Sequence, residues 1–153
     1  MNASSQKELI TLVTNTDTVI TLARNLVGKS KWKQRAPIED FPNHLDCSGL
    51  TMWVFAQIGI FLPRDPAGQF EYCRQHGRMI EVDDLSVGDL LFVDSPCSKK
   101  REVIGHVCLM VASDTLVCAT RSELGRGIIE IPLYQVLKTR RLCGIGRLIF
   151  HPK

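Results

Sequence analysis

The chain has 153 residues, the size of one domain whose apolar core needs no cross-links for stability. Hydrophobic residues make up 44% and charged residues 23%, as in an ordinary globular protein, and a net charge of +3 identifies no polyanionic partner. The six cysteines include no C-x-x-C pair, which excludes the usual zinc-ribbon and thioredoxin spacings, so we interpret most of them as buried thiols in a reducing compartment.

Three segments of the N-terminal half carry helix signals. Apolar residues recur at helical spacing over residues 16–27, and a glycine follows. Asp46 is placed to cap a second helix over residues 47–58. The segment RDPAGQFEYCRQHG predicts a third helix, with Asp65 as cap, proline at its first position and glycine at its end.

The C-terminal half changes to the two-residue period of β-strands. Five segments predict strands: GDLLFVD, GHVCLMV, TLVCAT, GIIEIP and GIGRLIF. Their short connections favour antiparallel pairing. Helices followed by strands predict one α+β domain over residues 1–153, with N-terminal helices packed on a five- to six-stranded antiparallel sheet.

Cys47 is the strongest candidate for chemistry, because it opens the second predicted helix within the sequence D-C-S-G. Unpaired backbone N–H groups and the helix dipole at this position favour thiolate over thiol, and the same N–H groups could hold an oxyanion. Gly49 would leave room for a substrate to approach the backbone. For an isolated D-C-S-G the alternative is a buried cysteine that begins a core helix.

A thiolate catalyst needs a base, normally a histidine, and four histidines are available. His106 follows Gly105 at the start of a predicted strand, where a rigid sheet could direct it at the helix end. His44 and His76 lie in a loop and in an exposed helix end, and His151 lies near the C-terminus. Position therefore favours His106.

Three segments carry ordered motifs: LDCSGLTMWVFAQIGIFLPRDPAGQ, then LSVGDLLFVD, then IGHVCLMVASDTLVCA. They resemble the NlpC family of papain-like cysteine peptidases. TLARNLVGKSKW resembles the leading helix of that family and RRLCGIGRLI its closing strand, so the likeness spans residues 19–149. The resemblance implies a papain-like fold, with Cys47 as nucleophile and His106 as base. It also implies substrate contacts by Asp46 and Ser48, which flank the cysteine, and neither metal nor organic cofactor.

The same resemblance implies an endopeptidase that hydrolyses peptidoglycan stem peptides, typically between the γ-carboxyl of D-glutamate and the diamino acid. Two alternatives remain open. One is an amidase or acyltransferase that uses the same dyad on another substrate. The other is a catalytically impaired module that only binds a wall peptide. Nucleic acid is an unlikely partner, because the arginines near the C-terminus lack interleaved aromatic residues, and the oligomeric state stays open.

The sequence departs from the family pattern twelve positions after the base, where Cys118 replaces the usual histidine or amide. A two-residue turn would put Cys118 on the opposite face from His106. A three-residue turn would pair Cys118 with Cys108 on the face of His106, and would set Thr120 directly across from His106. Thr120, a backbone carbonyl or a water could then orient the ring, or the site could be impaired. A third hypothesis has Cys47, His106 and Cys118 binding a soft metal, although Cys118 is expected behind the ring, away from Cys47.

A second departure precedes the nucleophile. The family's tyrosine and glycine pair is replaced by KSKWKQRAPIEDF, so Trp32 becomes a candidate for the substrate entrance or a cover for the core edge. The N-terminus does not resemble a standard signal peptide, and the longest apolar run is too short to span a bilayer. We expect a protein without membrane partners, either cytoplasmic or exported by another route, for example phage-borne or as a secreted effector.

Overall fold

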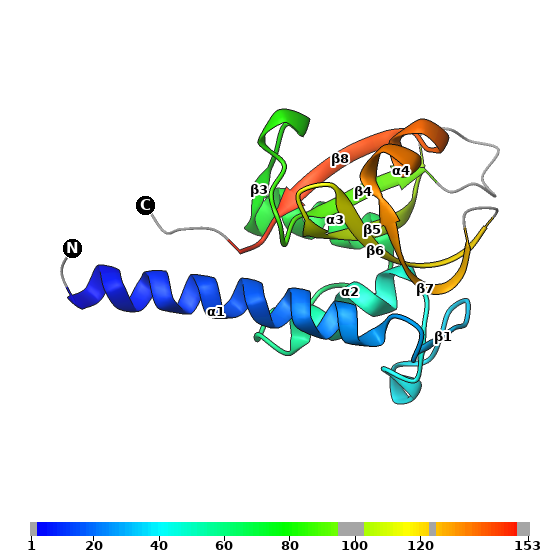
Figure 1. Cartoon of the computed structure of the whole chain (residues 1–153), viewed down its shortest axis with the longest axis horizontal. Helices are drawn as coiled ribbons and strands as arrows, with labels where there is room; N and C mark the ends of the chain where they lie inside the picture. Colours follow the sequence, from blue (N-terminus) through cyan, green and yellow to red (C-terminus); the bar gives the residue numbers. More distant parts are fainter. Residues whose placement is uncertain (1–2, 95–102, 123–124, 150–153) are drawn as a thin grey trace.

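The computed structural model describes residues 3–94, 103–122 and 125–149 of the chain. In these ranges three helices come first and the strands of one large sheet follow, with a fourth helix before the last strand (Figure 1). The predicted α+β class is confirmed. None of the described helices combines the length and the apolarity needed to cross a bilayer.

Helix α1 spans Ala3–Leu26 and begins well before the predicted start at residue 16. Its second half carries the apolar stripe, of which Val19, Ala23 and Leu26 are buried. Its first half projects beyond the body of the domain (Figure 1). The amphipathic pattern identified the part of this helix whose apolar stripe is buried, because packing requires an apolar face.

The next two helices begin where their capping residues predicted. Helix α2 covers Cys47–Ala56, and the Asp46 carboxylate accepts a hydrogen bond from the backbone N–H three residues on. Helix α3 covers Pro66–His76, and Asp65 caps it in the same way. The hydrogen bond of an aspartate cap joins residues only three positions apart. The start of such a helix can therefore be predicted without knowing what the helix packs against.

The main sheet is antiparallel throughout and has the order β3-β8-β4-β5-β6-β7. Its strands are β3 (Arg78–Met79), β4 (Leu90–Asp94), β5 (Ile104–Ala112), β6 (Thr115–Ser122), β7 (Gly125–Pro132) and β8 (Leu142–Arg147). All five predicted strands are present. The sixth, β3, consists of two exposed residues at the sheet edge, too short for an alternating pattern to reveal it.

The sheet separates two apolar layers. On one face α1, α2 and α3 cover a core that includes Val107, Leu109 and Val117. On the other face a smaller layer contains Cys108, Cys118 and Val136, the last from helix α4 (Leu133–Thr139). Successive residues of β5 therefore alternate between the two layers, as the pleat of a strand requires.

Four further short elements were not predicted. Strands β1 (Lys31–Trp32) and β2 (His44–Leu45) form a two-stranded parallel sheet, and a 3₁₀ turn, η1 (Ile38–Asp40), lies in the loop between them. A second turn, η2 (Val82–Asp84), precedes β4. The β1–β2 pair holds the segment before α2 against the main sheet, and this segment forms one wall of the cleft described next.

Candidate active site

A cleft of about 930 Å³ opens at the N-terminus of α2. The loop after β1 forms one side, and the ends of β5 and β6 form the other. Its lining includes Trp32, Arg35, Asp46, Cys47, Ser48, Arg64, His106, Thr120 and Arg121. Six of the seven predicted site residues therefore line one cleft, and Cys118 is the exception.

The first turn of α2 is fixed by Asp46. One carboxylate oxygen, Oδ1, accepts a hydrogen bond from the Gly49 N–H at 2.8 Å, and Oδ2 accepts one from the Arg35 N–H at 3.0 Å. A Cβ on Gly49 would lie 2.9 Å from both Asp46 Oδ1 and Phe41 Cζ. The prediction that Gly49 leaves room for a substrate is therefore wrong, because the protein's own side chains occupy that space.

Arg64 joins the two residues that flank Cys47. Its guanidinium donates to both oxygens of Asp46 at 2.9 and 3.0 Å, and also to Ser48 Oγ at 3.0 Å. A fourth hydrogen bond reaches the carbonyl of Ala36, and the ring of Phe41 lies 5.4 Å from the guanidinium carbon. Paired planar groups of this kind fix geometry as well as charge. Asp46 and Ser48 are thus part of an ordered frame around the thiol.

Gln69 fastens the same turn from α3. Its side chain is completely buried, and its amide donates to the carbonyls of Ser48 and Pro63 at 2.9 Å each. Its amide oxygen accepts a hydrogen bond from the Thr51 hydroxyl at 2.6 Å. Both polar atoms of this buried amide thus have hydrogen-bond partners in α2 or in the loop before α3. These hydrogen bonds offset the desolvation cost of burying the amide.

His106 approaches Cys47 from β5. Val93 of β4 pairs with His106 but Asp94 pairs with Ile104, so Gly105 is the extra residue of a β-bulge beside the histidine. Bulges redirect side chains at the ends of strands. The half-buried imidazole makes hydrogen-bonding contacts with the sulfurs of both Cys47 and Cys108.

Opposing effects set the pKa of His106. Burial is the largest single effect and would lower this pKa, but the sulfurs of Cys108 and Cys47 together raise it well above its usual range. Burial and the neighbouring Cys118 sulfur raise the pKa of the Cys108 thiol well above its usual range, while the charge of His106 opposes them. Of the two sulfurs beside the ring, that of Cys47 lines the cleft.

The β5–β6 hairpin has the register of the three-residue-turn alternative, one of the two considered from the sequence. Leu109 pairs with Val117 and Met110 with Leu116, and continuing this register sets Cys108 opposite Cys118 and His106 opposite Thr120. The turn itself has two residues, Ser113 and Asp114. A bulge after Met110 adds one residue to β5, so the register is the one that a three-residue turn would give. Cys118 is buried behind the ring and contacts Cys108, while Thr120 lines the cleft.

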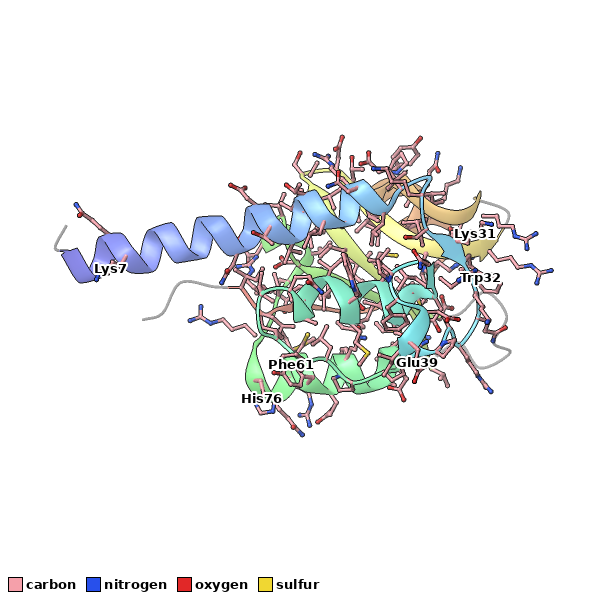
Figure 2. The ribbon with its side chains drawn as sticks, turned by 90° about the horizontal axis from the view of Figure 1, so that it is seen from below. Lys7, Lys31, Trp32, Glu39, Phe61 and His76 are labelled. Atoms are coloured by element: carbon pink, nitrogen blue, oxygen red, sulfur yellow. The ribbon has the colours of Figure 1, made fainter. Side chains whose placement is uncertain are left out.

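Trp32 and Arg121 face each other at the cleft, with the guanidinium carbon 5.9 Å from the centre of the indole ring. Figure 2 shows Trp32 at the end of the molecule opposite to the projecting end of α1, where Lys7 lies. His76 lies well away from Trp32 in the same view, on the surface of α3. The position of His76 agrees with the choice of His106, and His151 lies outside the described residues.

Cys108 and Arg64 are among the residues of the site that were not predicted from the sequence. Cys108 contacts the imidazole directly, and its position two residues after His106 on one strand was a usable signal. Arg64 lies in the L-P-R motif, but nothing in the sequence spacing indicated that it would reach across to Asp46. Both contacts depend on side-chain directions that only the folded chain defines.

The family model of "NlpC/P60 family" matches residues 27–145. The chain belongs to the NlpC/P60 family. Among curated relatives, "Gamma-D-glutamyl-L-lysine dipeptidyl-peptidase" of Bacillus subtilis (strain 168) is 28% identical over 102 residues, which are 67% of this chain and 32% of that protein. "Probable endopeptidase p60" of Listeria seeligeri is 33% identical over 78 residues, 51% of this chain and 13% of that protein.

Solved structures of the NlpC/P60 family share the fold. NlpC2 from Trichomonas vaginalis has a TM-score of 0.73 at 21% identity, over 89% of this chain and 47% of that one. The peptidoglycan hydrolase RipB from Mycobacterium tuberculosis has a TM-score of 0.66 at 20% identity, over 91% and 67%. The family and fold predicted from the sequence are confirmed, and the names of the relatives agree with the predicted hydrolase class. The chain spans only about a third or less of the two curated relatives.

Proposed function

We propose that the chain is a cysteine peptidase that hydrolyses amide bonds of peptidoglycan stem peptides, at the bond between the γ-carboxyl of D-glutamate and the diamino acid. The observation that carries the proposal is the contact between Cys47, at the start of α2, and His106 of β5, inside one cleft. The substrate class is supported by the NlpC/P60 membership and by the name of the Bacillus relative.

Cys47 is the nucleophile in this mechanism. Its thiolate attacks the scissile carbonyl, so that a carbon–sulfur bond forms and the carbonyl oxygen becomes an oxyanion. The first intrahelical hydrogen bond of α2 runs from the Leu50 N–H to the Asp46 carbonyl at 3.0 Å. The N–H groups of Cys47 and Ser48 precede this bond, and they are the donors we assign to the oxyanion.

His106 moves the proton. As an imidazolium it protonates the leaving amine, the carbon–nitrogen bond breaks, and an acyl-enzyme remains on Cys47. The neutral imidazole then takes a proton from water, whose oxygen attacks the acyl carbon and releases the sulfur. In this scheme Cys108 and Thr120 are positioning residues for the ring, and Cys118 acts on it only through Cys108.

The same proposal treats the chain as one catalytic domain. Residues of α1 that precede the family match, among them Val19 and Ala23, are completely buried in the core that also holds α2. Asp46, Ser48 and Trp32 remain the residues we propose for substrate contact. For Asp46 and Ser48 the hydrogen bonds from Arg64 fix the orientation in which a peptide would meet them.

Digestion of purified muropeptides tests the proposal, with products identified by mass spectrometry. Wild type is expected to release fragments cut after D-glutamate, and Cys47→Ala to release none. Cys143→Ala is the matched control, because Cys143 is a half-buried thiol of β8 that does not line the cleft. Intact muropeptides with wild type would overturn the peptidase proposal. Retention of intact muropeptides by that protein would then favour a binding module, and cleavage of other amides or esters would favour an amidase or acyltransferase.

A further inference from the structure

Three potential metal ligands gather behind the imidazole that faces Cys47. A ring nitrogen of His106 and the sulfurs of Cys108 and Cys118 all lie within 4.8 Å of one another. The two cysteines are buried, with exposed fractions of 0% and 3%, whereas His106 is half-buried. The group joins neighbouring strands, β5 and β6, so the backbone of the sheet holds the three side chains together.

This group is distinct from the pair that faces the cleft. Cys47 and His106 line the cleft, but Cys108 and Cys118 do not, and both belong to the apolar layer on the other face of the sheet. Cys47 is not a member of the group. The imidazole is thus the one side chain shared between the cleft and the two buried thiols. The ligand set considered from the sequence, Cys47 with His106 and Cys118, is replaced by one that contains Cys108.

We infer that His106, Cys108 and Cys118 form a binding site for a thiophilic divalent cation of the Zn²⁺ class. Thiolate and imidazole are ligands that zinc prefers, and three protein ligands with one exchangeable position are a common zinc arrangement. Tetrahedral zinc sets its ligand sulfurs about 3.8 Å apart, as its ~2.3 Å bonds to sulfur require. Atoms already within 4.8 Å of one another reach this geometry by small side-chain rotations.

Charge also favours a divalent ion over a monovalent one. Binding forms two zinc–sulfur bonds and one zinc–nitrogen bond and releases the two thiol protons to solvent. Two thiolates then neutralise the two positive charges of the ion, so no net charge is left in a buried layer, where it would be costly. No oxidant or reductant takes part.

The bound ion would inhibit the reaction proposed above, and this consequence rests on the proposed function. An imidazole that binds the ion through the nitrogen facing Cys108 keeps its one proton on the other nitrogen. Such a ring cannot accept a proton from Cys47, so the thiolate–imidazolium pair does not form. Zinc therefore acts from behind the ring and leaves the cleft itself open.

Metal binding is tested on the Cys47→Ala protein, so that the cleft thiol cannot supply a ligand. Titration with Co²⁺ in the presence of a phosphine reductant is expected to give thiolate-to-cobalt charge-transfer absorption that saturates at one ion per chain. Zinc is expected to abolish the signal by displacement. X-ray absorption of the zinc-loaded protein is expected to show two sulfur neighbours and at least one nitrogen. Oxygen and nitrogen neighbours alone would overturn the inference, and this measurement needs no change in the cluster.

Variants of the cluster sharpen the test, again with Cys47→Ala. Adding Cys118→Ala or Cys108→Ser is expected to weaken binding at least about tenfold, since even changes around metal ligands cost 10- to 100-fold in affinity. Cys143→Ala is the control and is expected to bind as before. Far-ultraviolet circular dichroism identifies any variant that fails to fold. Unchanged binding by folded Cys118→Ala and Cys108→Ser proteins would overturn the inference.

Inhibition separates this inference from the proposed function. If wild type cleaves muropeptides, Cys118→Ala is expected to require at least about tenfold more zinc for half inhibition, for the same loss of a ligand. Equal sensitivity of the two proteins would show that zinc acts at Cys47 instead, which overturns the inhibitory role. If wild type cleaves nothing but Cys47→Ala binds cobalt, the proposed function fails while the metal site stands.

Discussion

Arg64 holds Asp46 by two parallel hydrogen bonds at 2.9 and 3.0 Å, directly beside the thiol of Cys47. The pair is largely sheltered from solvent, with 33% and 15% of the two side chains exposed. The cap of α2, the loop after β1 and the L-P-R segment therefore meet at one guanidinium. Arg64 thus helps to position the cleft thiol, because it binds both residues that flank Cys47.

Arg64→Lys is expected to lower the free energy of unfolding by about 2 kcal/mol, because an ammonium cannot reproduce the fork that reaches Asp46, Ser48 and Ala36. Arg74→Lys is the matched control. Arg74 also forms a forked pair with a carboxylate, that of Glu71, but on the exposed surface of α3, where solvent screens the pair and its loss is expected to change stability little. Urea denaturation measures both. An equal decrease in the free energy of unfolding in the two variants would mean that the Arg64–Asp46 pair stabilises the fold no more than the exposed Arg74–Glu71 pair.

The elements that the sequence predicted well are those with local causes. Asp46 and Asp65 begin their helices through hydrogen bonds three residues away, so the signal and its structural effect share one short segment. Alternation in β5 and β6 likewise fixed which residues face each other. The observed pair of Leu109 with Val117 has the register of the three-residue-turn alternative, although the chain reaches it through a bulge.

The features that sequence reasoning missed have non-local causes. The β1–β2 pair joins two-residue strands across the loop that holds η1, and neither strand has a pattern of its own. The space beside Gly49 is taken by Phe41 and Asp46, so the glycine reflects packing rather than substrate access. The bulge at Gly105, beside His106, is likewise a feature that no periodicity indicates.

Gly49→Ala is expected to destabilise the protein by about 1–3 kcal/mol, as overpacking does, even though alanine is the better helix former. The added Cβ would lie 2.9 Å from Asp46 Oδ1, so it would displace the cap as well as the Phe41 ring. Thermal unfolding measures the loss. A Gly49→Ala variant more stable than wild type would show that the first turn of α2 can accommodate the added methyl group, and would contradict the prediction.

The protonation of His106 is predicted to depend on Cys47. In wild type the pKa of His106 is raised well above its ordinary value of about 6.5, because the sulfurs of Cys108 and Cys47 outweigh burial. Cys47→Ala removes one of these sulfurs, so the pKa of His106 is expected to fall while burial continues to lower it. NMR titration of the imidazole Cε1–H resonance in both proteins measures the difference. The same pKa of His106 in both proteins would show that Cys47 does not interact with the imidazole.

The raised pKa also determines how stability depends on pH. A folded-state pKa of His106 above the unfolded one means that protonation stabilises the fold, fully below about pH 6.5 and progressively less as pH rises through the folded value. Wild type is therefore expected to lose stability relative to Cys47→Ala as pH rises through that range. Urea denaturation over a pH series measures this difference. A constant difference between the two proteins would contradict the coupling.

Selective alkylation distinguishes the cleft thiol from a buried one. Burial, assisted by the charge of Asp89, raises the pKa of Cys73 to about 12, and its side chain is completely inaccessible. Cys47 lines the cleft beside His106, so iodoacetamide is expected to label it near pH 7 at least about tenfold faster than Cys73, because the thiolate is the reactive form. His106→Ala is expected to remove most of this advantage, since the neutral side chain no longer stabilises the anion. Peptide mapping by mass spectrometry locates the label.

Equal, slow labelling of both cysteines in the folded protein would mean that Cys47 is an ordinary thiol, and the peptidase mechanism would then lack its nucleophile.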